Sequence, residues 1–168
     1  MIEAIDSLRW TIDPDMQSLC GLPYHGHPRG CPNLGCKAGC PPQPLLEQVL
    51  DFSRPMYVIW TDFDLGSHVA RMHKRHPEWS DRQLYCCLYW QGTARKAHRE
   101  EQVRARRLYE INRIVSTPEA HGVNVTALMA LLNVHLEWPP MQLTRVVSLA
   151  GTAAHDAAAK AEKEQAHE

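Results

Sequence analysis

The sequence predicts a small single-domain α/β fold, with helices packed on a sheet and a long cysteine-rich loop that binds metal. A chain of 168 residues is long enough for one domain with a single core. From residue 45 onwards, strand-like runs alternate with helical ones. Between residues 20 and 44, five glycines and six prolines surround four cysteines, which excludes a helix or strand there. We expect the domain to span 1–151 and an alanine-rich, charged tail to follow at 152–168.

The first half of the chain offers one clear strand and two helical segments. A short strand is expected around Leu8–Ile12, and residues 45–52 have helical spacing. The run MYVIWTDF at 56–63 is β-branched and aromatic, which is typical of a buried strand. Residues 64–76 are expected to form a helix that ends before the following proline. One long helix should then run from an N-cap at Ser80 to about Tyr109.

The second half alternates in the same way. Residues 111–116 (INRIVS) are expected to form a strand, and Pro118 suits the first turn of a helix over 118–132. Two more strands are expected at 133–138 and 144–151. No internal repeat interrupts this pattern.

The N-terminal residues include acidic side chains and lack the apolar stretch of a secretory signal. No apolar run approaches the ~20 residues that a membrane-spanning helix needs. We therefore predict a cytoplasmic protein that has no membrane segment and keeps its thiols reduced. Six cysteines in such a compartment indicate metal or redox chemistry; a disulfide-stapled protein remains an alternative only if the chain is exported.

The cysteine spacings in the loop match parts of known cluster motifs. Cys36-x3-Cys40-Pro41 fits the last step of the bacterial ferredoxin pattern, and Cys31-x4-Cys36 fits the first step of the plant type. Neither whole motif is present. Zinc is the alternative metal, with His25 and His27 as additional ligands, although structural zinc sites commonly use two closely spaced ligand pairs. Those two histidines are equally consistent with an ordinary surface loop.

Two further cysteines, Cys86 and Cys87, fall inside the expected long helix. Neighbours on a helix point about 100° apart, so both cannot easily bind one metal ion. Cys87 shares the expected inward face with apolar residues and is the better ligand of the two. The competing explanation, two small buried apolar side chains, has equal weight.

Two segments resemble a known group of proteins. The pattern C-P-N-x-G-x4-C-P-P, from Cys31 to Pro42 and preceded by Cys20, resembles uncharacterised proteins described only as predicted metal-binding. The segment PEAHGVNV at 118–125 is similar to a second motif of that group. The resemblance implies a metal, most simply iron–sulfur, bound by Cys20, Cys31 and Cys40, with a later cysteine completing the set. In that group the position of Cys36 is usually not cysteine, which implies an extra thiol there.

Taken together, the sequence predicts a protein that binds one 4Fe–4S cluster. Cys20, Cys31 and Cys40 are the expected core ligands, and Cys36 or Cys87 is the fourth. The expected role is electron transfer, or sulfur-handling or substrate-binding chemistry at the cluster, with a redox partner or a small molecule. Whether the protein is an enzyme is left open.

The alternative function is a zinc-stapled module that contacts nucleic acid through a basic helix. That basic stretch is better explained as a solvated helix face with paired charges, so nucleic acid is the less expected partner. Its cations are Arg95, Lys96, Arg99, Arg104, Arg106 and Arg107. Outside the loop, Glu119 is the best candidate for a functional carboxylate, although a first-turn glutamate commonly just complements the helix dipole.

Overall fold

Two nine-residue strands rich in β-branched and aromatic residues form the centre of the fold, which is a small α/β domain. In the computed structural model, which describes residues 1–5, 12–23 and 27–154, β2 (Met56–Asp64) pairs antiparallel with β4 (Leu143–Gly151). β1 (Ile2–Ile5) joins the free edge of β2, and β3 (Arg113–Val115) joins the free edge of β4. The sheet order is β1-β2-β4-β3, with every neighbouring pair antiparallel.

The sequence correctly predicts three of these strands, at 56–63, 111–116 and 144–151. β1 was not predicted, and the strand expected around Leu8–Ile12 lies mostly outside the described residues. Ile12 itself is described, and it forms an isolated antiparallel bridge with Val123. Most of the expected charged tail, residues 155–168, also lies outside the described residues.

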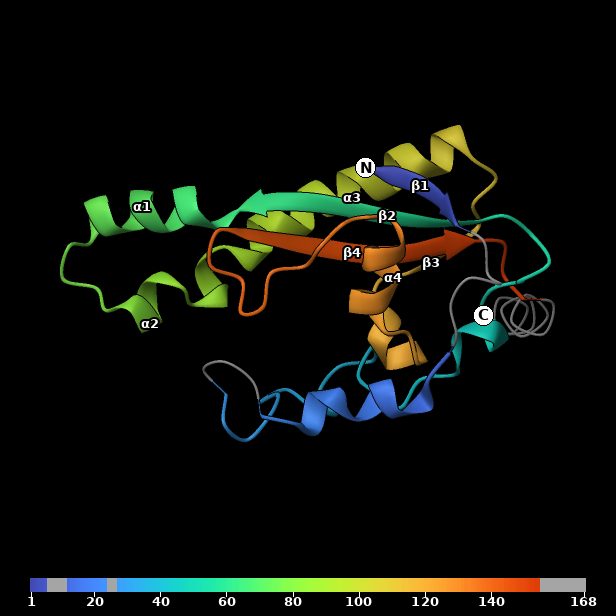
Figure 1. The fold of residues 1–168 in the computed structure, drawn as a ribbon, viewed down its shortest axis with the longest axis horizontal. Helices are drawn as coiled ribbons and strands as arrows, with labels where there is room; N and C mark the ends of the chain where they lie inside the picture. Colours follow the sequence, from blue (N-terminus) through green and yellow to red (C-terminus); the bar gives the residue numbers. More distant parts are fainter. Residues whose placement is uncertain (6–11, 24–26, 155–168) are drawn as a thin grey trace, which may run out of the picture.

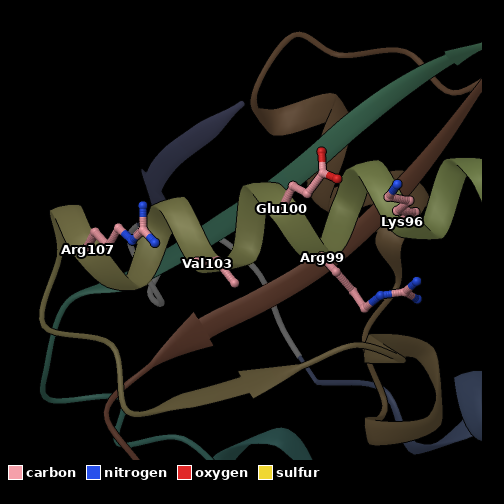
Figure 2. A pocket seen from close by; sticks show the side chains of 5 residues that line it. All are labelled: Lys96, Arg99, Glu100, Val103 and Arg107. Atoms are coloured by element: carbon pink, nitrogen blue, oxygen red, sulfur yellow. The ribbon is translucent and has the colours of Figure 1, made fainter.

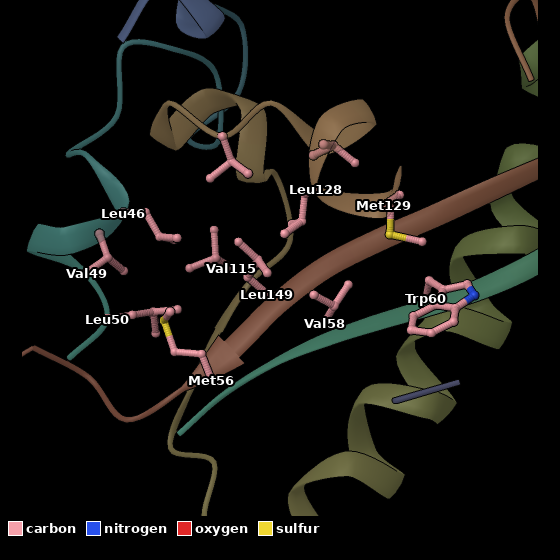
Figure 3. Close-up of a cluster of buried hydrophobic side chains, with 12 residues drawn as sticks. Leu46, Val49, Leu50, Met56, Val58, Trp60, Val115, Leu128, Met129 and Leu149 are labelled. Atoms are coloured by element: carbon pink, nitrogen blue, oxygen red, sulfur yellow. The ribbon is translucent and has the colours of Figure 1, made fainter. Parts of the chain in front are cut away.

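Side chains alternate along β2, so the sheet has two buried faces. Val58 and Trp60 face the larger core, where short helical segments cover the sheet (Figures 1 and 3). These segments are the 3-10 helices η3 (Leu46–Gln48) and η5 (Pro118–His121) and the helix α4 (Val125–Leu131). The larger core consists of Leu46, Val49, Leu50, Met56, Val58, Trp60, Val115, Val123, Val125, Leu128, Met129 and Leu149.

The opposite face of the sheet is covered by one helix, α3 (Gln91–Leu108) (Figure 1). Ile59 and Ala150 of the sheet pack with Ala105 of this helix. Alanine at this contact lets the helix backbone approach the strands closely. Two polar side chains, His98 and Ser148, are buried in the same layer. His98 is only 4% exposed, and its ring contacts Ser148 Oγ at 2.9 Å and Thr61 Oγ1 at 3.2 Å.

The helix expected over 64–76 is confirmed as α1 (Leu65–Arg75), which continues from the end of β2. The Asp64 carboxylate accepts a hydrogen bond from the Ser67 backbone N–H at 2.7 Å and so forms the N-cap. The helix expected over 45–52 shrinks to η3, the single 3-10 turn at Leu46–Gln48.

The single long helix expected from Ser80 to about Tyr109 is wrong. The chain instead forms α2 (Asp81–Leu84), the 3-10 helix η4 (Cys87–Tyr89) and then α3. Cys86 is extended at the break, and the Trp90 indole N–H donates to the Tyr85 carbonyl at 3.3 Å. Cysteine and aromatic residues favour helices weakly, and the break lets Trp90 stack on Phe63 with ring centroids 5.7 Å apart.

The helix expected over 118–132 is split, and the strand expected at 133–138 is absent. Gly122 adopts a left-handed conformation (φ 81°) that ends η5, and the Asn124 side chain then caps α4 by accepting from the Ala127 N–H at 2.9 Å. After α4, the Glu137 carboxylate accepts hydrogen bonds from the backbone of Gln142 and Leu143. The Glu137 side chain thus pairs the N–H groups of Gln142 and Leu143, which the backbone of a strand at 133–138 could otherwise have paired. Within the described residues, no helix is both long and apolar enough to cross a membrane.

His98 should make the stability of the fold depend on pH. Burial, followed by the nearby ammonium group of Met1, lowers the pKa of His98 from 6.5 to about 4, partly opposed by Glu101. Between these two values the unfolded chain binds more protons than the folded one, so stability should fall as the pH drops from about 7 towards 4. Urea unfolding at several pH values measures this loss. His98→Gln should flatten the dependence, whereas His73→Gln, an exposed change on α1, should not. A histidine NMR titration that places the His98 pKa near 6.5 in the folded protein would contradict this account.

Candidate metal centre

The cysteine-rich loop is attached to the side of the domain that lies away from α3. It begins in the 3-10 helix η2 (Pro14–Gly21), which packs beside η5. The Asp13 backbone N–H donates to the Gly122 carbonyl at 2.8 Å, next to the bridge between Ile12 and Val123. Figure 1 shows η5 and α4 lying between the sheet and η2. The site is therefore built on η5, and η5 is held by the larger core.

Two glutamines connect the start and the end of the loop to η5, Gln17 through its side chain and Gln43 through its backbone. The Gln17 side-chain amide donates to the carbonyls of Gln43 and Ala120, at 2.7 and 2.9 Å. The Gln43 backbone N–H donates to the same Ala120 carbonyl at 3.3 Å. The Gln43 side chain turns back into the loop and donates to the carbonyls of Ala38 and Cys40, at 2.8 and 2.6 Å. Cys40 is thereby held close to the η2–η5 contact.

The backbone also joins the first two cysteines of the loop. The Cys31 N–H donates to the Cys20 carbonyl at 2.8 Å. Gly30 makes this approach possible, since it is buried with φ 76°, and a Cβ at this position would lie 2.8 Å from the Cys20 carbonyl oxygen. Only glycine combines that conformation with that space.

All six cysteines are free thiols, and they differ in exposure. Cys20, Cys31 and Cys40 are half-buried, while Cys36 is exposed. The Cys40 thiol contacts the Asn33 carbonyl at 3.3 Å, and the Cys36 thiol contacts the Leu34 carbonyl at 3.7 Å. Within the loop, the three thiols with restricted access are therefore those at which the sequence resemblance places the ligands; outside it, Cys86 and Cys87 are half-buried as well.

Electrostatics show that these acidic groups are neighbours. Burial raises the pKa of the Cys20 thiol, and repulsion from Cys31, Glu119 and Cys40 raises this pKa further. Charges shift one another's pKa only when they are near, so Cys20 lies in the neighbourhood of these three groups. Even so, the described residues contain no group of three histidine, cysteine or acidic side chains close enough to hold one metal ion. Thiolates suit iron–sulfur and zinc chemically, but the thiols are gathered without forming a closed ligand set.

Glu119 and His121 place two further titratable groups on η5. Glu119 is solvent-accessible, yet the protein around it raises the pKa of its carboxyl group by desolvation. His121 is buried, and its Nδ1 lies 2.7 Å from the Pro44 carbonyl, so Nδ1 carries the proton and donates. Desolvation lowers the pKa of His121, opposed by this hydrogen bond and assisted by Arg113. Sequence reasoning selected Glu119 but missed His121, which lies in the same 118–125 segment.

Among the described residues, Cys86 and Cys87 form no metal-binding group with the loop cysteines. Cys86 and Cys87 lie in the connection between α2 and α3, at the end of the sheet beside α1 (Figure 1). Cys87 is half-buried in η4 and does not lie on a helix face that points towards the loop. His27 is partly buried, and its carbonyl accepts the Gly30 N–H at 3.1 Å, while His25 lies outside the described residues.

The chain has no significant match among protein-family models, curated proteins or solved structures. The resemblance of its loop to predicted metal-binding proteins therefore stays a prediction. The arguments for a metal centre rest on the chemistry and placement of its own residues.

Two glycines of the loop allow a matched test of its geometry. Gly30 and Gly35 share φ 76°, but a Cβ at Gly35 would meet nothing within 4 Å, whereas at Gly30 it would collide with the backbone of Cys20 and Gly21. Gly35→Ala should cost only the left-handed conformation, about 1–2 kcal/mol of the free energy of unfolding. Gly30→Ala should cost clearly more and should displace Cys20 from Cys31. Chemical denaturation of both variants measures the difference, and equal losses would contradict the described contact.

Proposed function

We propose that this protein binds an iron–sulfur cluster, of the 4Fe–4S type, through Cys20, Cys31 and Cys40. The observation that carries the proposal is that these three half-buried thiols share one loop fixed against η5, where burial, followed by repulsion from Cys31, Glu119 and Cys40, raises the pKa of Cys20. Ionised thiols held close together repel one another, whereas a cation bound between them attracts each of them. A bound metal would therefore replace the repulsion among the thiols by attraction to the metal and would stabilise the loop.

The structure of the loop supports a need for such a ligand. Between η2 and η3, the described residues form turns but no helix or strand. Few apolar side chains of this segment are buried, so its conformation depends on a small number of hydrogen bonds. Long loops of this kind in small domains are usually functional and need an organising contact. Binding energy at the thiols would supply it, because metal affinity is coupled to folding of the site.

Iron–sulfur is favoured over zinc by the ligands that the loop offers. Its cysteines are spaced as single steps of ferredoxin motifs and do not form the two paired knuckles of a structural zinc site. Glycines beside the cysteines leave room for backbone N–H groups near the sulfur atoms, and such hydrogen bonds tune cluster potentials. Zinc, stapling a module that contacts nucleic acid, remains the alternative function.

The number of thiolates decides which chemistry the cluster would support. Cys36 is the stronger candidate for a fourth ligand, since it belongs to the same loop and its thiol is exposed. Cys87 would have to approach from the α2–α3 connection. Four thiolates favour electron transfer with a redox partner, because every iron then has a protein ligand. Three would leave one iron open to a small molecule or to sulfur-handling chemistry. The proposal places the protein in the cytoplasm, where such thiols stay reduced.

Single cysteine-to-serine variants test both the centre and its ligands. Cys20→Ser, Cys31→Ser and Cys40→Ser should each lose iron and acid-labile sulfide, because serine is a much poorer ligand for iron–sulfur than thiolate. Cys86→Ser serves as the matched control and should keep wild-type content. Cys36→Ser should lose the cluster if four thiolates bind it and keep the cluster if three do. The measurement is iron and sulfide per chain after anaerobic purification, alongside circular dichroism to confirm folding.

Two outcomes would contradict the proposal. Wild-type metal content in both Cys31→Ser and Cys40→Ser would show that the loop cysteines do not bind the metal. If the wild type and every variant that binds metal contained zinc and no sulfide, the zinc-stapled module would replace the cluster as the explanation.

A further inference from the structure

The outward face of α3 is strongly basic. The helix carries six cations against two carboxylates, in a chain whose net charge is −1. At 100° per residue, Arg95, Arg99 and Arg106 fall within about 40° of arc. Lys96 and Arg107 follow next around the helix, and Val103 lies between this pair and the three arginines. These five exposed cations, Arg95, Lys96, Arg99, Arg106 and Arg107, are called the basic face below.

Part of the basic face surrounds a shallow hollow of about 390 Å³ (Figure 2). Its lining residues are Lys96, Arg99, Glu100, Val103 and Arg107. Glu100 is the only carboxylate in this lining, and it lies at the border of the basic arc. Three cations therefore share one solvent-open depression with one acid.

Within the part of the chain that the structure describes, the expected pairing of charges along the helix covers one of the six cations. Arg104 binds Glu101 at 3.1 Å, and Glu101 also binds the Met1 ammonium at 2.7 Å. Among the described residues, none of the five cations of the basic face has a carboxylate partner within 4.0 Å. The positive charge of this face is therefore available to a ligand.

We propose that the basic face binds the phosphate backbone of a nucleic-acid duplex without sequence specificity. Four of the five cations are arginine, whose planar guanidinium matches phosphate oxygens in pairs. From Arg95 to Arg106 the helix rises about 16 Å, a length over which one strand of a duplex presents about five phosphates. Each phosphate contact releases condensed counterions, so binding needs no apolar contact.

The same face is poorly suited to a protein or a membrane. A protein interface needs buried aromatic or aliphatic anchors, and the only apolar side chain inside the arc is Val103, which is 48% exposed. A helix that lies on a membrane must insert a continuous apolar face, which this arc lacks. The arc also lacks an aromatic ring for stacking on single-stranded bases, which favours a duplex.

The proposal is independent of the metal centre. α3 covers one face of the sheet, while the cysteine-rich loop lies beyond η5 on the other (Figure 1). Cys31→Ser should therefore leave nucleic-acid binding unchanged.

The test is fluorescence anisotropy of a labelled, mixed-sequence DNA duplex titrated with the full-length protein between about 50 and 200 mM salt. Binding at the lowest salt should weaken steeply as salt rises, with a log–log slope of up to about −4.5 if five phosphates are contacted. The double variant Arg99→Gln/Arg106→Gln should bind more weakly and reduce the magnitude of the slope by about 1.8.

The matched control is Lys74→Gln/Arg75→Gln at the end of α1, where both side chains are exposed and the change in net charge is the same. It should bind like the wild type. Equal losses in the two double variants would show that net charge alone is responsible and would overturn the proposal. Undetectable binding of the wild type at low salt, or equally tight binding of labelled poly-glutamate, would overturn it as well.

Discussion

The carbonyl oxygen of Ala120 is the contact on which the candidate site depends. It accepts hydrogen bonds from the Gln17 side chain, near the start of the cysteine-rich loop, and from the Gln43 backbone, near its end. A loop closed at one fixed point has far fewer conformations than a free segment of equal length. The Ala120 carbonyl is itself fixed, since Pro118 and Val123 on either side of it are fully buried. The larger core thus holds η5 in place, and this short 3-10 helix in turn holds the loop that carries the thiols.

Sequence reasoning succeeded where one residue pattern decided the local structure. The strands at 56–63 and 144–151 are apolar runs that only a two-sided sheet can bury. β1 was missed because its four residues become a strand only by pairing with β2, with Ile5 and Ile2 packed on opposite faces of the sheet. The break at Cys86 was missed for a similar reason, since stacking of Trp90 on Phe63 outweighs helix continuity. The strand expected at 133–138 does not form, and its backbone has a side-chain partner instead: the Arg145 guanidinium donates to the His135 carbonyl at 2.7 Å.

The candidate site was predictable in its ligands and not in its supports. Cysteine density among glycines and prolines marked the loop, and within it Cys20, Cys31 and Cys40 prove to be half-buried while Cys36 is exposed. The contacts of Gln17 and Gln43 with Ala120 carry no signal in a single sequence, because each joins residues that are distant along the chain. His121 was missed for the same reason: its partner, the Pro44 carbonyl, is 77 positions away. Cys87 was weighed on a continuous helix, which the structure replaces by a short 3-10 turn.

The fold separates two chemistries on opposite faces of one sheet. Thiols gather on the side of η5, where repulsion makes a cation favourable. Cations gather on α3, where the basic face has no carboxylate partner among the described residues and an anion is therefore favourable. The central claim is that an iron–sulfur cluster organises the loop. It is tested most directly by measuring iron, acid-labile sulfide and zinc per chain in anaerobically purified wild-type protein, together with the visible spectrum. The account predicts a brown protein with matched iron and sulfide; a colourless protein with neither iron nor sulfide would contradict it.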